Sequence, residues 1–192
     1  MMTNQEVTQE QFKNLIEDAE YLQDEAEALK YVIDQVPYSE VPPEGLSIYQ
    51  KLSLIEHMQT NYYRPVIEKT FEQPRVFKLS SFTHYSETFE TDDKEEEDVI
   101  RLLNKIIKHR AALLNLFRNI PLIDWERGIN DKRDNLISMY HFASDMVKEE
   151  RRILKEIADL VLIYQNNKQQ QRSAQKGVEN RKRNGGEEDR VE

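Results

Sequence analysis

The sequence of 192 residues contains no cysteine, five glycines, six prolines and no long apolar run. The absence of cysteine excludes disulfides, iron–sulfur clusters, thiolate zinc sites and cysteine nucleophiles. Glycine and proline are too scarce for the many tight turns of a β-sandwich or β-barrel. Because no stretch of about 18 apolar residues occurs, we expect no membrane span. The polar, acidic first ten residues lack the apolar core of a signal peptide, so we expect a cytoplasmic protein.

The composition describes a charged and acidic chain. Lys and Arg together number 27 against 36 Asp and Glu, which gives a net charge of -9, and 33% of the residues are charged. Such a surface repels a phosphate backbone, so we expect no nucleic-acid partner. The hydrophobic share of 38% in a chain of this length is sufficient for the core of one domain.

Four long segments carry apolar residues at the three- and four-residue spacing of an amphipathic helix. Thr8 with Gln11, and Ser47 with Gln50, match the capping boxes that begin a helix. Pro65 lies inside the second segment, where it should kink the helix or end it early. The predicted helices span approximately residues 8–36, 47–72, 92–120 and 134–170.

Four helices with one apolar stripe each bury those stripes most simply against one another. We therefore predict an all-α domain over residues 1–170, a four-helix bundle with long connections, at least one of which crosses the bundle. The connection over residues 73–91 is rich in aromatic residues, and a packed loop of this kind is a common place for a ligand lid. Residues 171–192 have almost nothing to bury and are predicted to form a disordered tail.

Two charged residues fall on the apolar stripes. At about 100° per residue, Arg110 aligns with the apolar face of the third helix and Glu150 with that of the fourth. A buried charge is costly unless it is paired. We therefore predict that Arg110 and Glu150 point inward and meet each other or a bound ligand. They form either a structural ion pair or a pair that orients a ligand.

The sequence offers few residues for a metal site. It has four histidines and no HExxH or HxxxH pair on the predicted helices. His57 lies off the centre of its apolar stripe, which favours a position at the surface. Asp145 and Glu149 are one turn apart and can either chelate a cation together or form part of a solvated acidic face. Tyr62 is a core residue or part of a ligand pocket.

Three stretches, "VPPEGLSIYQKLSLIEHMQTNYY", "IIKHRAALLNLFRNIPLIDWERGI" and "NLISMYHFASDMVKEERRILKEIADL", resemble the DinB-like family, also called DinB/YfiT-like metalloenzymes. The resemblance covers residues 10–162. It implies a four-helix bundle, often dimeric, with a divalent metal held by one histidine of the second helix and an HxxxH pair of the last. Some members of the family are thiol-dependent transferases or isomerases.

The chain departs from the family at the metal ligands. Aligned through Ile153 and the residues after it, the HxxxH positions hold Glu149 and Ile153. Aligned through the start of the helix, they hold Asp145 and Glu149, or Met146 and Glu150. No alignment restores two histidines. The family's metal site is therefore predicted to be lost or altered.

Three hypotheses follow. In the first, the bundle has no catalytic set, and it either binds a small molecule in a pocket near Arg110, Glu150 and Tyr62 or acts through a dimer surface. In the second, the protein is a hydrolase or thiol transferase that uses a divalent metal (Zn, Ni or Mn). His57 would then hold the metal with one or two of the carboxylates of Asp145, Glu149 and Glu150. In the third, it is a helical adaptor with an interacting charged tail. Each of the three hypotheses is compatible with a homodimer.

Overall fold

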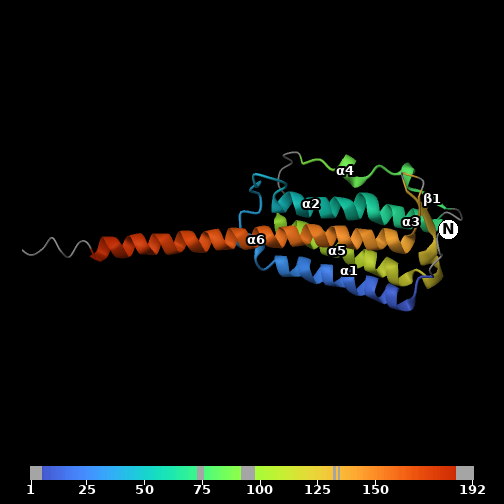
Figure 1. Ribbon diagram of the computed structural model, residues 1–192, viewed down its shortest axis with the longest axis horizontal. Helices are drawn as coiled ribbons and strands as arrows, with labels where there is room; N and C mark the ends of the chain where they lie inside the picture. Colours follow the sequence, from blue (N-terminus) through green and yellow to red (C-terminus); the bar gives the residue numbers. More distant parts are fainter. Residues whose placement is uncertain (1–5, 73–75, 92–97, 132, 134, 185–192) are drawn as a thin grey trace, which may run out of the picture.

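The protein is almost entirely helical, as the sequence predicts. The computed structural model describes residues 6–72, 76–91, 98–131, 133 and 135–184, with side chains as far as residue 176. Long helices lie side by side along one axis (Figure 1). They are α1 (Gln9–Leu29), α2 (Ile48–Met58) with its continuation α3 (Arg64–Glu72), α5 (Val99–Asn119) and α6 (Met139–Asn184).

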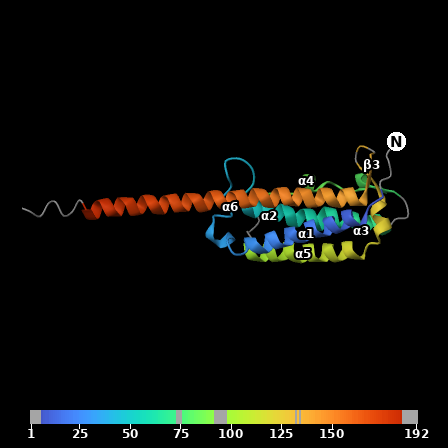
Figure 2. The same ribbon diagram turned by 60° about the horizontal axis from the view of Figure 1, so that its bottom comes forward.

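These helices form a four-helix bundle in which each long helix has two neighbours. α1 packs against α5 and α6, and α2 packs against the same two helices (Figure 2). Helices that follow one another in the chain, α1 then α2 and α5 then α6, therefore occupy opposite corners. Their connections cross the end of the bundle, which confirms the expected crossover. The core includes Leu22, Ile55, Phe117, Trp125 and Ile157, all of which are buried.

Both predicted capping boxes are present and fix the start of the first two bundle helices. The backbone N–H of Gln11 donates to Thr8 Oγ1 (3.1 Å), and the N–H of Thr8 donates to Gln11 Oε1 (2.9 Å). The same reciprocal pair joins Ser47 and Gln50, at 3.1 and 3.0 Å. Each box satisfies two N–H groups that an uncapped helix leaves without a partner.

The helix over residues 48–72 continues through Pro65 instead of breaking. Between α2 and α3 the chain forms one wide π-helical segment, η2 (Gln59–Tyr63). A proline ring clashes with the carbonyl four residues earlier in a regular α-helix, here that of Asn61. A π segment just before the proline widens the turn at that point, which explains how the helix accommodates Pro65.

The end of the first helix differs from the prediction. The first helix stops at Leu29 and is followed by a 3₁₀ turn, η1 (Ile33–Gln35). The β-branched residues Val32 and Ile33 favour helix weakly, which explains the early end. α5 begins after Asp98, whose Oδ1 accepts the backbone N–H of Ile100 (2.7 Å). The predicted start at residue 92 lies outside the described residues.

A small sheet that the sequence pattern did not predict closes one end of the bundle. β1 (Phe77–Lys78) pairs in parallel with β2 (Gly128–Asn130), and β2 pairs antiparallel with β3 (Leu136–Ser138). Residues 136–138 are therefore strand, and α6 begins at Met139 rather than near residue 134. The 3₁₀ turn η4 (Leu122–Glu126), which carries the buried Trp125, precedes the sheet.

The segment over residues 77–89, which we call the strap, lies along the outside of α2 (Figure 1). It begins with β1, continues through the 3₁₀ turn η3 (Leu79–Ser81) and contains the short helix α4 (Tyr85–Thr88). Phe77 and Leu79 are buried, and Phe82 and Tyr85 pack against the core. The packed connection expected here is confirmed.

α6 is longer than predicted and projects from the bundle at the end opposite the sheet (Figure 1). Residues 171–184 continue the helix, although the sequence predicted disorder from residue 171. Extending an existing helix avoids the cost of nucleation, and the Gln, Lys and Arg residues here are good helix formers. Residues 171–176 are all exposed, as expected of a segment with nothing to bury. In the part of the chain that the structure describes, no helix is long and apolar enough to cross a membrane.

Candidate functional site

Arg110 of α5 and Glu150 of α6 meet inside the bundle, as predicted. Their exposed fractions are 2% and 0%. The Nη2 group of Arg110 donates to Glu150 Oε2, and its Nη1 group donates to the backbone carbonyl of Ala19 in α1 (3.2 Å). This pair therefore ties three helices of the bundle together through one guanidinium group.

Burial dominates the energetics of this pair. It lowers the pKa of Arg110 to about 9, because desolvation penalises the charged form, yet the guanidinium stays protonated at neutral pH. Arg110 Nε and Glu150 Oε1 have no hydrogen-bond partner among the described residues. A pair that is charged, buried and incompletely satisfied contributes little net stability but is costly to break. Of the two alternatives, the direct contact between Arg110 and Glu150 favours a structural ion pair. A role in orienting a ligand stays a prediction.

Tyr62 belongs to a group of packed rings that we call the tyrosine cluster. It comprises Tyr62 and Tyr63 of η2, His84 and Tyr85 of the strap, and Phe142 of α6. Tyr62 lies 5.1 Å from Tyr63, 5.0 Å from His84 and 5.6 Å from Tyr85 between ring centroids. Phe142 packs on Tyr63 at 5.4 Å. The rings meet mostly tilted or edge to face, the arrangements that aromatic side chains prefer.

A hydrogen bond links this cluster to a carboxylate on α6. The hydroxyl of Tyr85 donates to Glu149 Oε1 (3.3 Å), and the ring of Tyr63 packs on that of Tyr85 at 5.8 Å between centroids. Burial, with smaller contributions from Tyr85 and Glu87, raises the pKa of Tyr62 to about 12. Burial also raises the pKa values of Tyr63 and Tyr85. Hydrogen bonds from Arg152 lower the pKa of Glu149. At neutral pH the cluster therefore offers neutral phenols that lead to one ionised carboxylate.

The strap positions two of the five rings. His84 is the N-cap of α4, where its Nδ1 accepts the backbone N–H of Ser86 (3.3 Å) and lies 2.7 Å from Ser86 Oγ. The ring of His84 stacks on Tyr85 at 4.1 Å. His84 therefore both caps α4 and packs on Tyr85.

His57, the predicted metal ligand of the second helix, has both ring nitrogens in contact with neighbours. Its Nε2 lies 2.8 Å from Thr88 Oγ1, and its Nδ1 lies 2.9 Å from Asn61 Nδ2. Its ring packs on Phe89 at 5.6 Å. These contacts hold the strap to α2, so a metal ion here would have to displace one of them.

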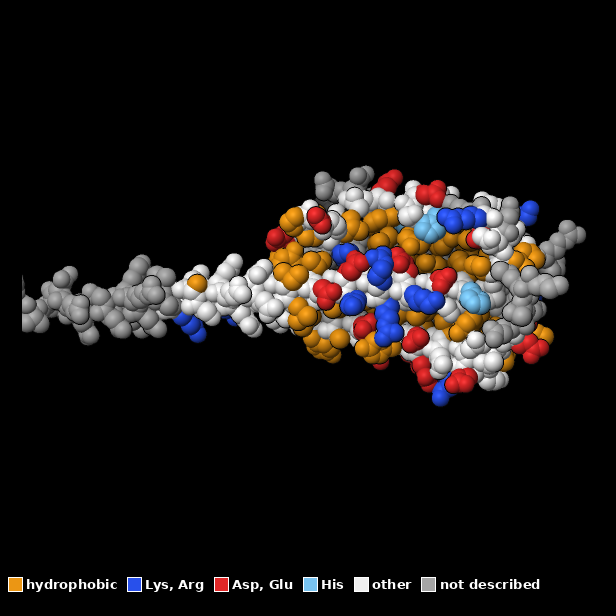
Figure 3. Space-filling model, in the orientation of Figure 1, with side chains coloured by type: hydrophobic (Ala, Val, Ile, Leu, Met, Phe, Trp, Pro, Cys, Tyr) orange, Lys and Arg blue, Asp and Glu red, His pale blue; other side chains and the backbone are white. Residues whose placement is uncertain are grey.

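The three carboxylates proposed to join His57 each pair with a different cation. Asp145 is exposed, and its Oδ1 lies 3.1 Å from Lys148 Nζ. Glu149 Oε1 lies 2.7 Å from Arg152 Nη2. Glu150 faces the interior and Arg110. Figure 3 shows basic and acidic side chains interspersed along α6 on this face.

No group of three or more His, Asp or Glu side chains among the described residues is placed to hold a metal ion. In this part of the chain, His57 and the three carboxylates are each engaged by neighbouring side chains.

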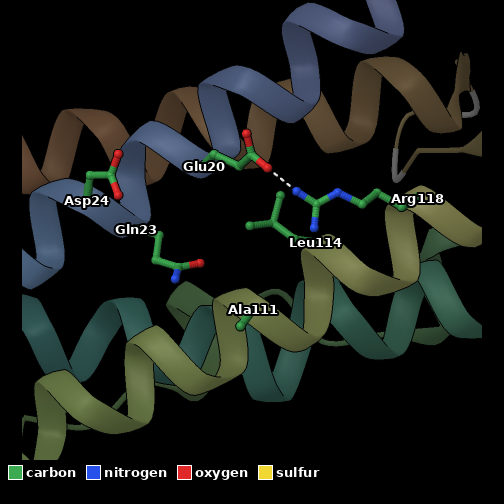
Figure 4. Close-up of a pocket in the computed structure, with 6 residues that line it drawn as sticks. All are labelled: Glu20, Gln23, Asp24, Ala111, Leu114 and Arg118. Atoms are coloured by element: carbon green, nitrogen blue, oxygen red, sulfur yellow. Dashed lines mark hydrogen bonds and ion pairs between the residues drawn. The ribbon is translucent and has the colours of Figure 1, made fainter.

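A polar hollow of about 440 Å³ lies between α1 and α5 (Figure 4). Glu20, Gln23 and Asp24 line it from α1, and Ala111, Leu114 and Arg118 line it from α5. Glu20 and Arg118 form an ion pair across it, and each of these side chains is about half exposed. Exposed ion pairs of this kind contribute at most about 1 kcal/mol and mark ordinary surface.

The sequence pattern missed most of the tyrosine cluster. Tyr63 follows Tyr62 in the second predicted helix, while Tyr85 lies in the connection over residues 73–91. Phe142 carried no polar signal at all. The tandem aromatic pair just before Pro65 was the available clue, because both tyrosines are buried where the π segment interrupts the regular α-helix.

The architecture and the crossed connections define a four-helix bundle. Among solved structures, the chain is similar to YfiT from Bacillus subtilis, described as a probable metal-dependent hydrolase with an unusual four-helix bundle topology. The TM-score is 0.66, with 14% sequence identity over 80% of this chain and 87% of YfiT. The family resemblance is thus confirmed at the level of the fold. No protein-family model and no curated protein sequence match the chain.

Proposed function

We propose that this DinB-like bundle binds a small molecule at the tyrosine cluster, beneath the strap, and that the family's metal position has been lost or altered. The observation that carries the proposal is the hydrogen bond from Tyr85, a ring of the tyrosine cluster, to Glu149. It places neutral hydroxyl groups and one carboxylate side by side among aromatic rings. The strap supplies Tyr85, so its movement would open or close the site, as expected of a ligand lid.

The chemistry of the cluster favours a ligand with a flat ring and a protonated amine. Aromatic faces attract cations, and a carboxylate at the edge of the rings supplies the counter-charge. Arg152 pairs with both Glu149 and Glu156. Glu149 can therefore bind a cationic group of a ligand while Arg152 remains paired with Glu156.

Calorimetric titration with tyramine tests the proposal. We expect binding to the wild type, and we expect Glu149→Gln to weaken it about tenfold or more, the size of one charge-assisted hydrogen bond. Asp145→Asn is the matched control, because Asp145 is an exposed carboxylate one turn away and should leave the affinity unchanged. Absence of tyramine binding, or equal loss in both variants, would refute the proposal.

A second candidate is a divalent-metal-dependent hydrolase or thiol transferase that uses His57 with Asp145, Glu149 or Glu150. Its support is the fold shared with YfiT, a probable metal-dependent hydrolase. Metal analysis of the untagged protein and thermal shifts with Zn²⁺, Ni²⁺ and Mn²⁺ separate the two. Stoichiometric metal that is lost in His57→Ala would favour this second candidate over the first.

A further inference from the structure

A second, smaller cavity lies on a different face of the bundle, where η2 and α3 pack against α5. Its volume is about 220 Å³. The residues that line it include Gln59, Thr60, Arg64, Glu68, His109 and Leu113. No residue of the tyrosine cluster is among those that line it, so this cavity is independent of the function proposed above.

Gln59 is the unusual residue of this cavity. Its exposed fraction is 2%, and within the described residues neither its amide oxygen nor its amide nitrogen has a hydrogen-bond partner. A buried amide without partners is unfavourable, and proteins rarely retain one unless water or a ligand completes its hydrogen bonds. Gln59 is also the first residue of the π segment η2, and such segments occur frequently at functional sites.

The other polar groups provide donors and acceptors around the amide. Arg64 Nε donates to Glu68 Oε1 (2.8 Å), and the guanidinium carries further N–H groups on its terminal nitrogens. His109 Nδ1 lies 3.5 Å from Glu56 Oε1 and has no hydrogen-bond partner in the described part of the chain. Leu113 adds an apolar wall.

We propose that this cavity binds a small planar cyclic amide or ureide whose N–H and C=O edge pairs with the side-chain amide of Gln59. An amide side chain presents one donor and one acceptor side by side, which is the arrangement that lets glutamine pair bidentately with a nucleobase edge. A second carbonyl of such a ring would face the N–H groups of Arg64 or His109. The cavity is below the usual range of about 300–1,000 Å³ for drug-sized ligands, which limits the ligand to about one ring.

Uracil is the probe, and 1,3-dimethyluracil is its matched control. The two share the ring and both carbonyls, but methylation removes both N–H donors. By calorimetry or ligand-observed NMR we expect the wild type to bind uracil. Loss of the paired hydrogen bonds should weaken binding of the dimethyl compound about tenfold or more. Failure of uracil to bind, or equal binding of both compounds, would overturn the proposal without requiring any variant.

The variant Gln59→Leu tests the same proposal independently of the ligand comparison. Leucine removes the unpaired amide at similar size, so the variant should fold and melt at the same temperature as the wild type or higher. We expect it to lose uracil binding about tenfold or more while tyramine binding stays unchanged. Gln23→Leu on α1 is the control and should bind uracil normally. If Gln59→Leu kept its affinity for uracil, the assignment of this cavity would be wrong, whether or not the variant still bound tyramine. Failure of the wild type to bind tyramine would refute only the function proposed for the tyrosine cluster.

Discussion

Replacing Arg110 with leucine should destabilise the bundle severely, although leucine is the more apolar residue. The substitution leaves the carboxylate of Glu150 at 0% exposure without its partner. Breaking a buried pair in this way costs about 3–5 kcal/mol. A domain of this kind has a total stability of about 5–15 kcal/mol, so the loss is a large fraction of the whole.

The double variant, Arg110→Leu with Glu150→Leu, should recover most of that loss. Removing both charges removes the desolvation penalty together with the attraction, and such replacements are often neutral or stabilising by about 1–4 kcal/mol. Urea unfolding, followed by helical circular dichroism and by the fluorescence of the buried Trp125, gives the four free energies of a double-mutant cycle. In a thermal scan the single variant should melt about 6–20 °C lower, at about 2–4 °C per kcal/mol for this chain length.

Arg118→Leu is the control on the same helix. Arg118 pairs with Glu20, but the exposed fractions of these side chains are 50% and 46%. Its loss should cost at most about 1 kcal/mol. If Arg110→Leu cost no more than this control, or if the double variant were as unstable as the two single losses added together, the assignment of a buried, coupled ion pair would be wrong.

Three further predictions concern other parts of the molecule. Ser47→Ala should lower the unfolding free energy by about 1 kcal/mol, because the side chain caps α2; chemical denaturation measures this, and no loss would contradict it. Because burial raises the pKa of Tyr62 to about 12, its contribution to stability is complete below pH 10 and is lost as the pH rises toward 12. Tyr62→Phe should therefore flatten the decline of the melting temperature in that range, and an unchanged slope would refute this. Deleting residues 171–192 should leave the melting temperature unchanged, since residues 171–176 are exposed; a lower temperature would mean that the tail packs.

The helical core was predictable because it depends on local signals that act within a few residues. Thr8 and Ser47 each find their glutamine partner three residues later, so the caps could be identified directly. Arg110 and Glu150 could be placed inside because a regular α-helix turns by a constant angle per residue. Their contact then followed from the cost of burying one charge alone.

The sheet, and the course of the packed strap along α2, could not be predicted, because they depend on pairing between distant residues. Phe77 of β1 lies opposite Ile129 of β2, and no local pattern indicates such a partner. The tyrosine cluster shares this difficulty, since Tyr85 reaches Tyr62 only after the strap folds back along α2. The π segment was missed for a different reason: its wide turn departs from the constant angle on which the stripe analysis relies.

The same contrast explains how this chain can share the fold of YfiT without sharing its sequence. A bundle needs only apolar stripes of the right period, which many sequences satisfy, so 14% identity is compatible with a shared fold. A metal site needs particular side chains that converge on one point. On α6 the carboxylates of Asp145, Glu149 and Glu150 instead pair with Lys148, Arg152 and Arg110 respectively. A metal ion at these carboxylates would therefore have to compete with cations that the chain itself provides.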